Sequence, residues 1–469
     1  MNPGIFREYD IRGVAGEDFN QADAVSIGKA YGTMLCNYWK SDPNKKIVLT
    51  VGRDCRLTSD EYSKAFMKGI LSTGCDVIDI GVCPTPVLYF SIHHCKTQGG
   101  AMVTASHNPP EYNGFKLMNG YDSIHSTGLQ DIRKIIDSEK YTSGEGSLSA
   151  VDVVTPYKNY ILENISIDYS DKFLDGSNLD TPKKIRIGVD AGNGTGSITA
   201  IPVLKALGCE VHELYCTMDG RFPNHPADPT VKKNMLELID LVREKNLDLG
   251  VGYDGDADRI GIIDEKGGII YGDQLMVIFA REILSRKPGA TFISEVKCSM
   301  TMYNDIEKHG GRGIMWKTGH SLIKKKMKEE NAELAGEMSG HMFFSDRYLG
   351  YDDALYATCR LLEIIANTGK TVSELIEDLP ITFTTPEIRV DCADDIKFDV
   401  VKKITDKFKE KYKVIDIDGM RALFEDGWGL VRASNTQPAL VLRFEAATEK
   451  RLDEIRNEVE TALNKIIKG

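Results

Sequence analysis

The sequence predicts an α/β protein made of three related α/β domains with mixed sheets, followed by a C-terminal α+β domain. Two observations support this class. Through most of the chain, apolar strand-like segments alternate with helix-like segments and glycine turns, which is typical of βαβ units. Near the end the order changes to a strand, an amphipathic helix, several strands and a closing helix, which is typical of an α+β domain.

Three segments share one order of elements. The stretches "KKIVLTVGRD" (45–54), "KKIRIGVDAGNGTG" (183–196) and "GATFISEVKCS" (289–299) each resemble an apolar strand that enters a polar loop. A helix-like segment and a glycine then lead to a second strand, in "LSTGCDVIDIG", "CEVHELY" and "RGIMWKTGH". Because the same order occurs three times, we predict three related units.

The C-terminal part begins with the strand-like "PEIRVD". The segment "DDIKFDVVKKITDKFKEKY" predicts an amphipathic helix whose apolar face includes Ile396, Val400 and Ile404. Several strands with tight turns and the helix "EKRLDEIRNEVETALNKII" follow. We expect linkers near 142–152 and 365–385. The expected domain boundaries are 1–150, 151–268, 269–378 and 379–469.

Composition excludes several classes of protein. The chain has 469 residues, a net charge of −12 and ten cysteines without a C-x-x-C pair. Scattered cysteines predict reduced thiols in a cytoplasmic protein, and the start "MNPGIFREYDIRG" does not resemble a signal peptide. The acidic balance argues against nucleic acid or a membrane as partner, and no apolar run is long enough to span a bilayer. The sequence does not indicate an oligomeric state.

The motif "DGDADR" gives the strongest local signal for a metal site. Asp254, Asp256 and Asp258 alternate, so a turning loop would direct three carboxylates to one centre, where a divalent cation would relieve their repulsion. Hard oxygen ligands favour Mg²⁺, Ca²⁺ or Mn²⁺ over zinc. A calcium EF-hand is excluded because Arg259 stands where that loop needs glycine. The alternative is a solvated acidic turn, although an adjacent arginine favours phosphate chemistry.

Two glycine-bounded loops allow both structural and functional interpretations. The loop "DAGNGTGS" resembles a dinucleotide fingerprint, but Ser197 replaces the third glycine, which favours a plain strand-to-helix turn. In "AGEMSGH", Glu337, Ser339 and His341 alternate, so an extended loop would place them on one face, where they suit sugar hydroxyls. A simple glycine-bounded turn is the alternative for this second loop.

The loop "RASNTQP" combines an arginine with hydroxyl groups and turn amides. This combination would form a phosphate cradle, and an ordinary β-turn explains it equally well. The residues concerned are Arg432, Ser434, Asn435 and Thr436.

Two more loops contain candidate residues. In "WKTGHSLIKKKMKEE", His320 at a loop-to-helix junction is the candidate, whereas the KKK run is predicted to be a solvated helix face. The two prolines of "VTASHNPPEYNGFK" (103–116) predict a shaped loop. Taken alone, Ser106 is a capping serine, because the neighbouring His107 does not make a triad and no G-x-S-x-G motif is present.

Four of these loops together carry a resemblance to a known family. The motifs "TASHNP", "DGDADR", "GEMSGH" and "RASNTQP" occur in the order and wide spacing of the α-D-phosphohexomutase superfamily. The sequence is similar in particular to its bacterial phosphomannomutase/phosphoglucomutase group, over essentially the whole chain, including "YDIRG" near the start. The resemblance implies four domains around a central cleft, each supplying one loop.

The resemblance also implies residue roles. The expected catalytic residues are Ser106, as phosphoryl carrier, with Lys116, His341, Arg12 and Arg259. The expected ligands of Mg²⁺ are Ser106, through its phosphoryl oxygen, Asp254, Asp256 and Asp258. The residues expected to bind substrate are Tyr9, His107, Asn108, Lys297, His320, Glu337, Ser339, Arg432, Ser434, Asn435 and Thr436.

The implied activity is a phosphohexomutase that interconverts hexose 6-phosphate and hexose 1-phosphate of mannose, glucose or both. It would use a phosphoserine enzyme and a hexose 1,6-bisphosphate as intermediate and activator. Phosphoryl transfer needs positioning and charge neutralisation, so Ser106 requires no adjacent base. Met338 resembles the mannose/glucose group, whereas a glutamine there is typical of phosphoglucosamine mutases, the alternative. Gln437 stands where the family often has Thr or Glu, and we expect little effect.

Overall fold

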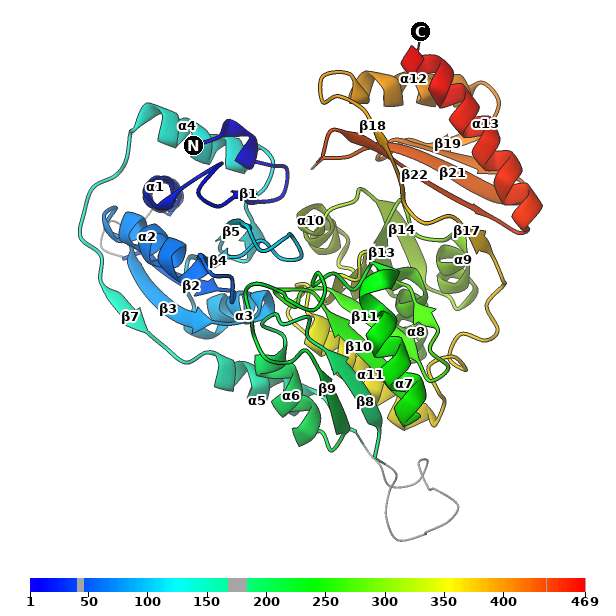
Figure 1. Ribbon diagram of the computed structural model, residues 1–469, viewed down its shortest axis with the longest axis horizontal. Coiled ribbons are helices and arrows are strands. Elements are labelled where there is room, and N and C mark those ends of the chain that lie inside the picture. Colours follow the sequence, from blue (N-terminus) through cyan, green and yellow to red (C-terminus); the bar gives the residue numbers. More distant parts are fainter. Residues whose placement is uncertain (40–45, 168–183, 436, 469) are drawn as a thin grey trace.

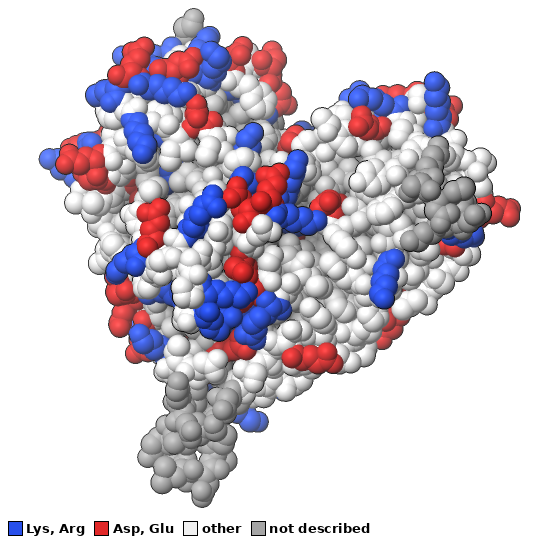
Figure 2. Space-filling view, turned by 180° about the vertical axis from the view of Figure 1, so that it is seen from behind, with Lys and Arg blue, Asp and Glu red and all other residues white. Residues whose placement is uncertain are grey.

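The computed structural model describes residues 1–39, 46–167, 184–435 and 437–468, and in this part of the chain four β-sheets form (Figure 1). The blue N-terminal part and the red C-terminal part lie on two sides of the molecule, with the green and yellow segments between them. Seen from behind, the surface has a notch between these two lobes (Figure 2). The predicted class, three α/β units followed by an α+β unit, is confirmed, and the exact boundaries stay a prediction.

The first unit contains a seven-stranded sheet in the order β1-β5-β4-β2-β3-β7, with β6 paired to β5. Its strands are β1 (Ile11–Val14), β2 (Val48–Arg53), β3 (Asp76–Val82), β4 (Gly99–Val103), β5 (Tyr112–Asn119), β6 (Asp122–Ser123) and β7 (Leu148–Ala150). Its helices are η1 (Pro3–Ile5), α1 (Gln21–Tyr38), α2 (Ser59–Leu71), α3 (Thr85–Cys95) and α4 (Thr127–Ser138). Helices α1 and α2 pack so closely that neither has room for a side chain at the contact. A Cβ at Gly28 or at Gly69 would lie 2.1 Å from a carbonyl oxygen of the other helix.

The second unit has a five-stranded sheet in the order β12-β11-β10-β8-β9. Its strands are β8 (Arg186–Asp190), β9 (Glu210–Leu214), β10 (Leu249–Tyr253), β11 (Ile260–Asp264) and β12 (Ile269–Ile270). Its helices are α5 (Val154–Asn164), α6 (Ser197–Ala206), η2 (Lys232–Met235) and α7 (Leu236–Lys245).

The third unit has a four-stranded sheet in the order β14-β13-β15-β16. Its strands are β13 (Thr291–Glu295), β14 (Arg312–Trp316), β15 (Leu334–Gly336) and β16 (Met342–Phe344). Its helices are α8 (Gly272–Arg286), α9 (Met300–Lys308), α10 (His320–Glu330) and α11 (Ala354–Thr368).

These three sheets repeat one topology. In each, two strands joined by a helix pair in parallel, a third strand joins in parallel on the other side of the first, and a fourth runs antiparallel to the third. The repeats are β3-β2-β4-β5, β9-β8-β10-β11 and β14-β13-β15-β16. The loop between the third and fourth strands holds "TASHNP", "DGDADR" and "GEMSGH" respectively. Three equivalent turns therefore supply three of the four predicted site loops.

The fourth unit has an antiparallel sheet in the order β17-β22-β21-β20-β19, with β18 paired to β22. Its elements are β17 (Phe383–Thr384), β18 (Ile388–Asp391), α12 (Lys397–Lys409), β19 (Lys413–Ile415), β20 (Met420–Phe424), β21 (Gly427–Ala433), β22 (Ala439–Ala446) and α13 (Glu449–Lys468). Val400 and Ile404 are buried as predicted, but Ile396 is 44% exposed. The prediction for Ile396 is wrong because α12 begins one residue later, which leaves that side chain outside the first turn.

Buried apolar side chains link the first three units more tightly than the fourth. One large cluster extends from α3 through the second unit and into the third, and the first unit also has a cluster of its own. The fourth unit has a separate core and shares with the third unit a small cluster of Val296, Trp428 and Leu430. Among the described residues, no helix combines the length and the apolar character needed to cross a bilayer.

Candidate active site

Ser106 lies in the loop between β4 and β5 and is 2% exposed. Its φ of +50° is in the left-handed region, and its backbone N–H donates to Thr104 Oγ1 at 2.9 Å. Its Oγ donates to Asp254 Oδ2 in the second unit at 2.6 Å. The prediction that all of 103–116 is a loop is wrong. The two prolines occupy only the turn, and residues 112–116 belong to β5, a strand between β1 and β4.

His107 lies beside Ser106 as a neutral ring. Its Nδ1 is 3.2 Å from Ser106 Oγ. Burial, together with the nearby charges of Arg259 and Arg12, holds the pKa of His107 well below its ordinary value. Arg12 also donates to Asn108 Oδ1 at 2.8 Å. The structure therefore brings Arg12, His107 and Asn108 together around Ser106.

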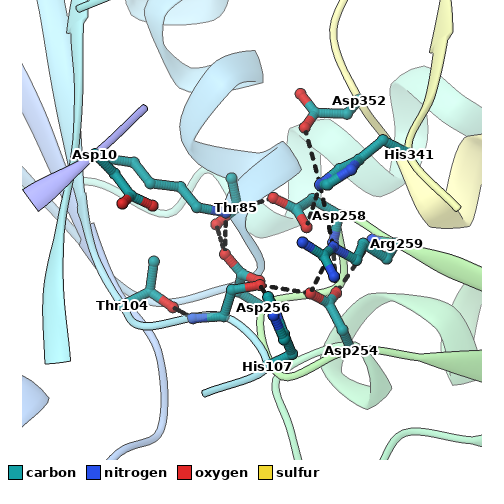
Figure 3. Close-up of polar contacts among 12 residues, drawn as sticks. Asp10, Thr85, Thr104, His107, Asp254, Asp256, Asp258, Arg259, His341 and Asp352 are labelled. Carbon is teal, nitrogen blue, oxygen red and sulfur yellow. Dashed lines mark hydrogen bonds and ion pairs between the residues drawn. The ribbon is translucent and has the colours of Figure 1, made fainter. Parts of the chain in front are cut away.

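Asp254, Asp256 and Asp258 lie fully buried in the loop between β10 and β11 (Figure 3). Each offers an oxygen within 4.8 Å of those of the other two. Among the described residues, Asp256 Oδ1 has no hydrogen-bond partner, whereas Asp258 Oδ1 lies 3.3 Å from His341 Nε2. A buried carboxylate oxygen without a partner is costly, and a cation coordinated by all three carboxylates would satisfy it. The donor set therefore fits a hard divalent cation such as Mg²⁺.

Lys116 extends from β5 into this acidic cluster. Its Nζ lies 2.6 Å from Asp256 Oδ2 and also pairs with Asp258 Oδ2. Burial would lower the pKa of Lys116, but Asp256 and Asp258 outweigh it and raise that pKa well above its ordinary value. Burial and the neighbouring carboxylates raise the pKa of Asp254. Lys116 and His341 outweigh burial at Asp258 and hold its pKa well below the ordinary value.

The third loop is the hairpin between β15 and β16. Of the two alternatives for this loop, the glycine-bounded turn forms, because the N–H of Gly340 donates to the carbonyl of Glu337 at 3.0 Å. The predicted convergence is nevertheless present, since His341 Nδ1 is 3.1 Å from both Glu337 Oε2 and Ser339 Oγ. The hairpin meets the aspartate loop through a backbone bridge between Arg259 and His341.

His341 faces carboxylates on two sides (Figure 3). Its Nε2 lies 3.3 Å from Asp258 Oδ1 and 3.8 Å from Asp352 Oδ2. Burial would lower the pKa of His341, but the charge of Asp258 outweighs it and raises the pKa to about 9. The ring of His320, at the start of α10, stacks on His341 with ring centres 5.6 Å apart. Burial lowers the pKa of His320 well below its ordinary value, so a neutral and a charged imidazole lie together.

The sequence-based interpretation missed Lys324 and Asp352. Lys324 is 8% exposed, its Nζ is 3.2 Å from Asp352 Oδ1, and it lies 4.2 Å from the ring centre of Tyr89 in the first unit. The prediction of a solvated KKK face is therefore wrong for Lys324, although Lys325 is exposed. The acidic pair in "YDDALY" was the available signal for Asp352.

The fourth loop joins β21 to β22 and contains Arg432, Ser434, Asn435 and Thr436, the last of which lies outside the described residues. Arg432 is 5% exposed, and its Nε donates to Asp418 Oδ2 at 3.0 Å. Within the described part of the chain, Arg432 Nη2 has no hydrogen-bond partner. A buried guanidinium nitrogen without a partner suits an anion such as phosphate.

Tyr9 joins three units through its hydroxyl. That hydroxyl accepts a hydrogen bond from Asn435 Nδ2 at 2.8 Å and donates to the carbonyl of Thr318 at 2.8 Å. Burial raises the pKa of Tyr9, so the hydroxyl keeps its proton. Lys297, in the third unit, has its Nζ 3.3 Å from Glu387 Oε2 on the segment that enters the fourth unit. The structure thus places Tyr9 and Lys297 between the third and fourth units.

The loop "DAGNGTGS" supports the aspartate loop. It forms the turn between β8 and α6, as the favoured interpretation expected. The N–H of Thr195 donates to the carbonyl of Gly255 at 3.0 Å, and a Cβ at Gly194 would lie 2.6 Å from that same carbonyl oxygen. Its glycines therefore allow a close approach between two loops of the second unit.

Comparison with protein-family models shows which family this arrangement of four units belongs to. Models of the phosphoglucomutase/phosphomannomutase family match along the chain, with alpha/beta/alpha domain I at 3–143, domain II at 167–268, domain III at 271–383 and the C-terminal domain at 387–462.

Relatives resemble the chain over nearly its full length. It is 42% identical over 453 residues to the phosphomannomutase/phosphoglucomutase of Pseudomonas aeruginosa, covering 96% of this chain and 94% of that protein. It is 38% identical over 464 residues to the phosphoglucomutase of Neisseria gonorrhoeae, covering 98% and 96%. A crystal structure of a phosphoglucomutase/phosphomannomutase family protein from Burkholderia thailandensis superimposes with a TM-score of 0.89 at 37% identity, covering 100% and 99%. The chain therefore belongs to the phosphoglucomutase/phosphomannomutase family, within the α-D-phosphohexomutase superfamily.

Proposed function

We propose that the protein interconverts hexose 6-phosphate and hexose 1-phosphate, of mannose, glucose or both, by passing a phosphoryl group through Ser106. The observation that most directly supports this is the 2.6 Å hydrogen bond from Ser106 Oγ to Asp254, at the edge of a buried cluster of three aspartates. This contact supports Ser106 as a nucleophile next to the proposed cation site. Phosphoryl transfer depends on such positioning and charge neutralisation. The names of the relatives support the same reaction.

Mg²⁺ is the cation that we propose for this cluster. Lys116 pairs with the Oδ2 atoms of Asp256 and Asp258, and Asp256 Oδ1, which has no hydrogen-bond partner among the described residues, is left for a cation. We propose that these two residues hold it together with Asp254 and an oxygen of phosphoserine 106. When bound, the cation would neutralise charge on the transferring phosphoryl group.

The chain's own residues would then perform two transfers. In the first, the bond from phosphorus to Ser106 Oγ breaks as a bond to the free sugar hydroxyl forms, and the hydroxyl proton passes to a base. We propose His341 for this proton transfer, because it contacts Glu337 and Ser339, the residues proposed to hold the sugar hydroxyls. The resulting hexose 1,6-bisphosphate turns over, and Ser106 Oγ then bonds to the other phosphorus as the bond from that phosphorus to the sugar oxygen breaks. The proton taken up in the first transfer returns to this sugar oxygen. Lys116 would keep its proton and stabilise charge.

The remaining residues would hold the sugar. Glu337 and Ser339, which meet at His341, are proposed to bind sugar hydroxyls. Arg432 Nη2 is buried and has no hydrogen-bond partner among the described residues, which supports a phosphate site in the fourth unit. The other proposed contacts are Arg12, Arg259, Tyr9, His107, Asn108, Lys297, His320, Ser434, Asn435 and Thr436.

Intact mass spectrometry tests the phosphoserine directly. After incubation with glucose 1,6-bisphosphate, the protein is expected to gain one phosphoryl mass on Ser106, and Ser106→Ala is expected to lose both this mass and isomerase activity. Ser126→Ala is a matched control, because Ser126 lies in the same unit and also has a φ of +50°. Full activity of Ser106→Ala would overturn the proposal.

Coupled assays separate the substrates. Mannose 1-phosphate and glucose 1-phosphate are expected to turn over faster than glucosamine 1-phosphate, because Met338 resembles the mannose/glucose group and the relatives cited above have matching names. Preferential turnover of glucosamine 1-phosphate would establish the alternative, a phosphoglucosamine mutase.

A further inference from the structure

Arg56 is a fully buried arginine between β2 and α2 whose guanidinium lies beneath the serine loop. Its Nη1 donates to the carbonyls of Pro109 at 2.6 Å and Tyr112 at 3.1 Å. Its Nη2 donates to the carbonyls of Ser106 at 2.7 Å and Asn108 at 2.6 Å. A single planar group thus binds three carbonyls of this loop and that of Tyr112, the first residue of β5. This requires the fixed fork of arginine, since a lysine offers three donors from one point.

The amide N–H of Ser106 is tied to the same place by a second route. It donates to Thr104 Oγ1 at 2.9 Å, and that hydroxyl donates to Asp54 Oδ2 at 2.7 Å. Asp54 Oδ2 also accepts from Arg56 Nε at 3.1 Å. Both the N–H and the carbonyl of Ser106 are therefore anchored to one buried ion pair. Such anchoring is what a non-glycine residue at φ +50° requires, because that conformation is unfavourable by itself.

The second unit covers this ion pair from the other side. The ring of Phe222 lies over the Arg56 guanidinium, with its centre 5.0 Å away. The loop that holds the three aspartates approaches just as closely, since a Cβ at Gly255 would lie 2.5 Å from the carbonyl oxygen of Ser106. One carbonyl, that of Ser106, is consequently held between Arg56 and the aspartate loop. This carbonyl therefore connects Arg56 to the loop that holds Asp254.

We propose that Arg56, with Asp54, is the positioning residue that aims the Ser106 hydroxyl and its phosphoryl group at the aspartate cluster. This inference rests on the proposed phosphoserine function. Arg56 acts through the loop backbone and does not contact the substrate. When the loop loosens, the phosphoryl group is expected to drift from the acceptor hydroxyl, so that water competes better for it. In that side reaction a water oxygen bonds to phosphorus, the bond to Ser106 Oγ breaks, and a water proton reaches Oγ as inorganic phosphate leaves.

The test compares Arg56→Lys with Arg360→Lys. Arg360 is also fully buried, in the third unit. Its guanidinium donates hydrogen bonds to the carbonyl and carboxylate of Asp346 and to the carboxylate of Glu282. For Arg56→Lys we expect kcat to fall on the order of 100-fold with KM nearly unchanged, because the sugar-holding residues are untouched. We also expect the ratio of phosphate release to isomerisation to rise on the order of tenfold. Arg360→Lys is expected to lower the melting temperature without changing this ratio.

The outcomes separate this inference from the function on which it rests. If the wild-type protein takes no phosphoryl group on Ser106, both fail together. If the wild-type protein is phosphorylated but Arg56→Lys keeps the wild-type ratio of phosphate release to isomerisation, the positioning role alone is overturned. Should Arg56→Lys not fold, Thr104→Val decides instead, because it removes only the hydroxyl that links Ser106 N–H to Asp54. It is expected to raise the same ratio by a smaller factor, and an unchanged ratio would refute the proposal.

Discussion

Asp353 makes the stability of the protein depend on pH. It caps α11, is fully buried, and accepts hydrogen bonds from the hydroxyls of Tyr157 at 2.9 Å and Tyr348 at 2.6 Å and from the N–H of Tyr356 at 2.9 Å. Burial raises its pKa from 3.8 to about 6. The folded protein therefore binds this proton more tightly than the unfolded chain. The stabilisation is complete below pH 3.8 and is lost as the pH rises through 6.

The size of the effect follows from the shift. A rise from 3.8 to about 6 corresponds to ~3 kcal/mol of unfolding free energy, of which ~1.4 kcal/mol is lost between pH 5 and pH 8. Asp353→Asn removes this titration. Urea unfolding of both proteins should show that the difference in unfolding free energy between wild type and Asp353→Asn decreases by ~1.4 kcal/mol from pH 5 to pH 8. Asp240→Asn, at an exposed position on α7, should follow the wild type. Parallel curves for wild type and Asp353→Asn would refute the reasoning.

Four further predictions concern the site. Lys116→Met leaves buried carboxylates without their ammonium, so we expect a loss of ~3–5 kcal/mol in stability and a large loss of activity; an unchanged melting temperature would contradict this. Gly255→Ala places a Cβ 2.5 Å from the carbonyl oxygen of Ser106, so phosphoryl uptake measured by mass should slow by ~100-fold, and normal uptake would argue against close contact of the loops. Asn435→Ala loses the bond to Tyr9, worth ~1 kcal/mol, and should change KM about fivefold while kcat stays near wild type. Chelation by EDTA should abolish isomerisation, and Mg²⁺ should restore it and raise the melting temperature, because the cation relieves carboxylate repulsion.

The repeated fold could be predicted from the sequence because its signals are local. Each βαβ unit can be recognised in the sequence from an apolar strand, a polar loop, a helix and a glycine within a few dozen residues. The equivalence of the three site loops could not be predicted in the same way. It depends on the fourth strand of each repeat turning back against the third, as β5 does against β4, and the prolines before β5 led us to expect a longer loop. Pairing direction is set by contacts across the sheet, which no single segment displays.

The site divides into parts that residue spacing shows and parts that it does not. Alternating aspartates in one short loop converge because neighbours along the chain stay neighbours in space. The burial of Lys324 did not follow from its neighbours in the sequence, because consecutive residues on a helix point about 100° apart. Three lysines in a row therefore cannot share one solvated face on a helix that packs against a sheet and a neighbouring unit. Arg56 gave no sequence signal at all, since the four carbonyls that it binds lie about fifty residues further along the chain.

The two ends of the site stand on parts of the molecule with separate apolar cores. Ser106 and the aspartate loop stand on units joined by one continuous apolar cluster, so their spacing is fixed by the same contacts that hold the fold together. Arg432 stands on a unit with a core of its own, which, among the described residues, shares one small apolar cluster with the third unit. The hydrogen bond from Asn435 to Tyr9 already joins the first and fourth units. Breaking this bond is therefore expected to leave the distance from Ser106 Oγ to Asp254 unchanged.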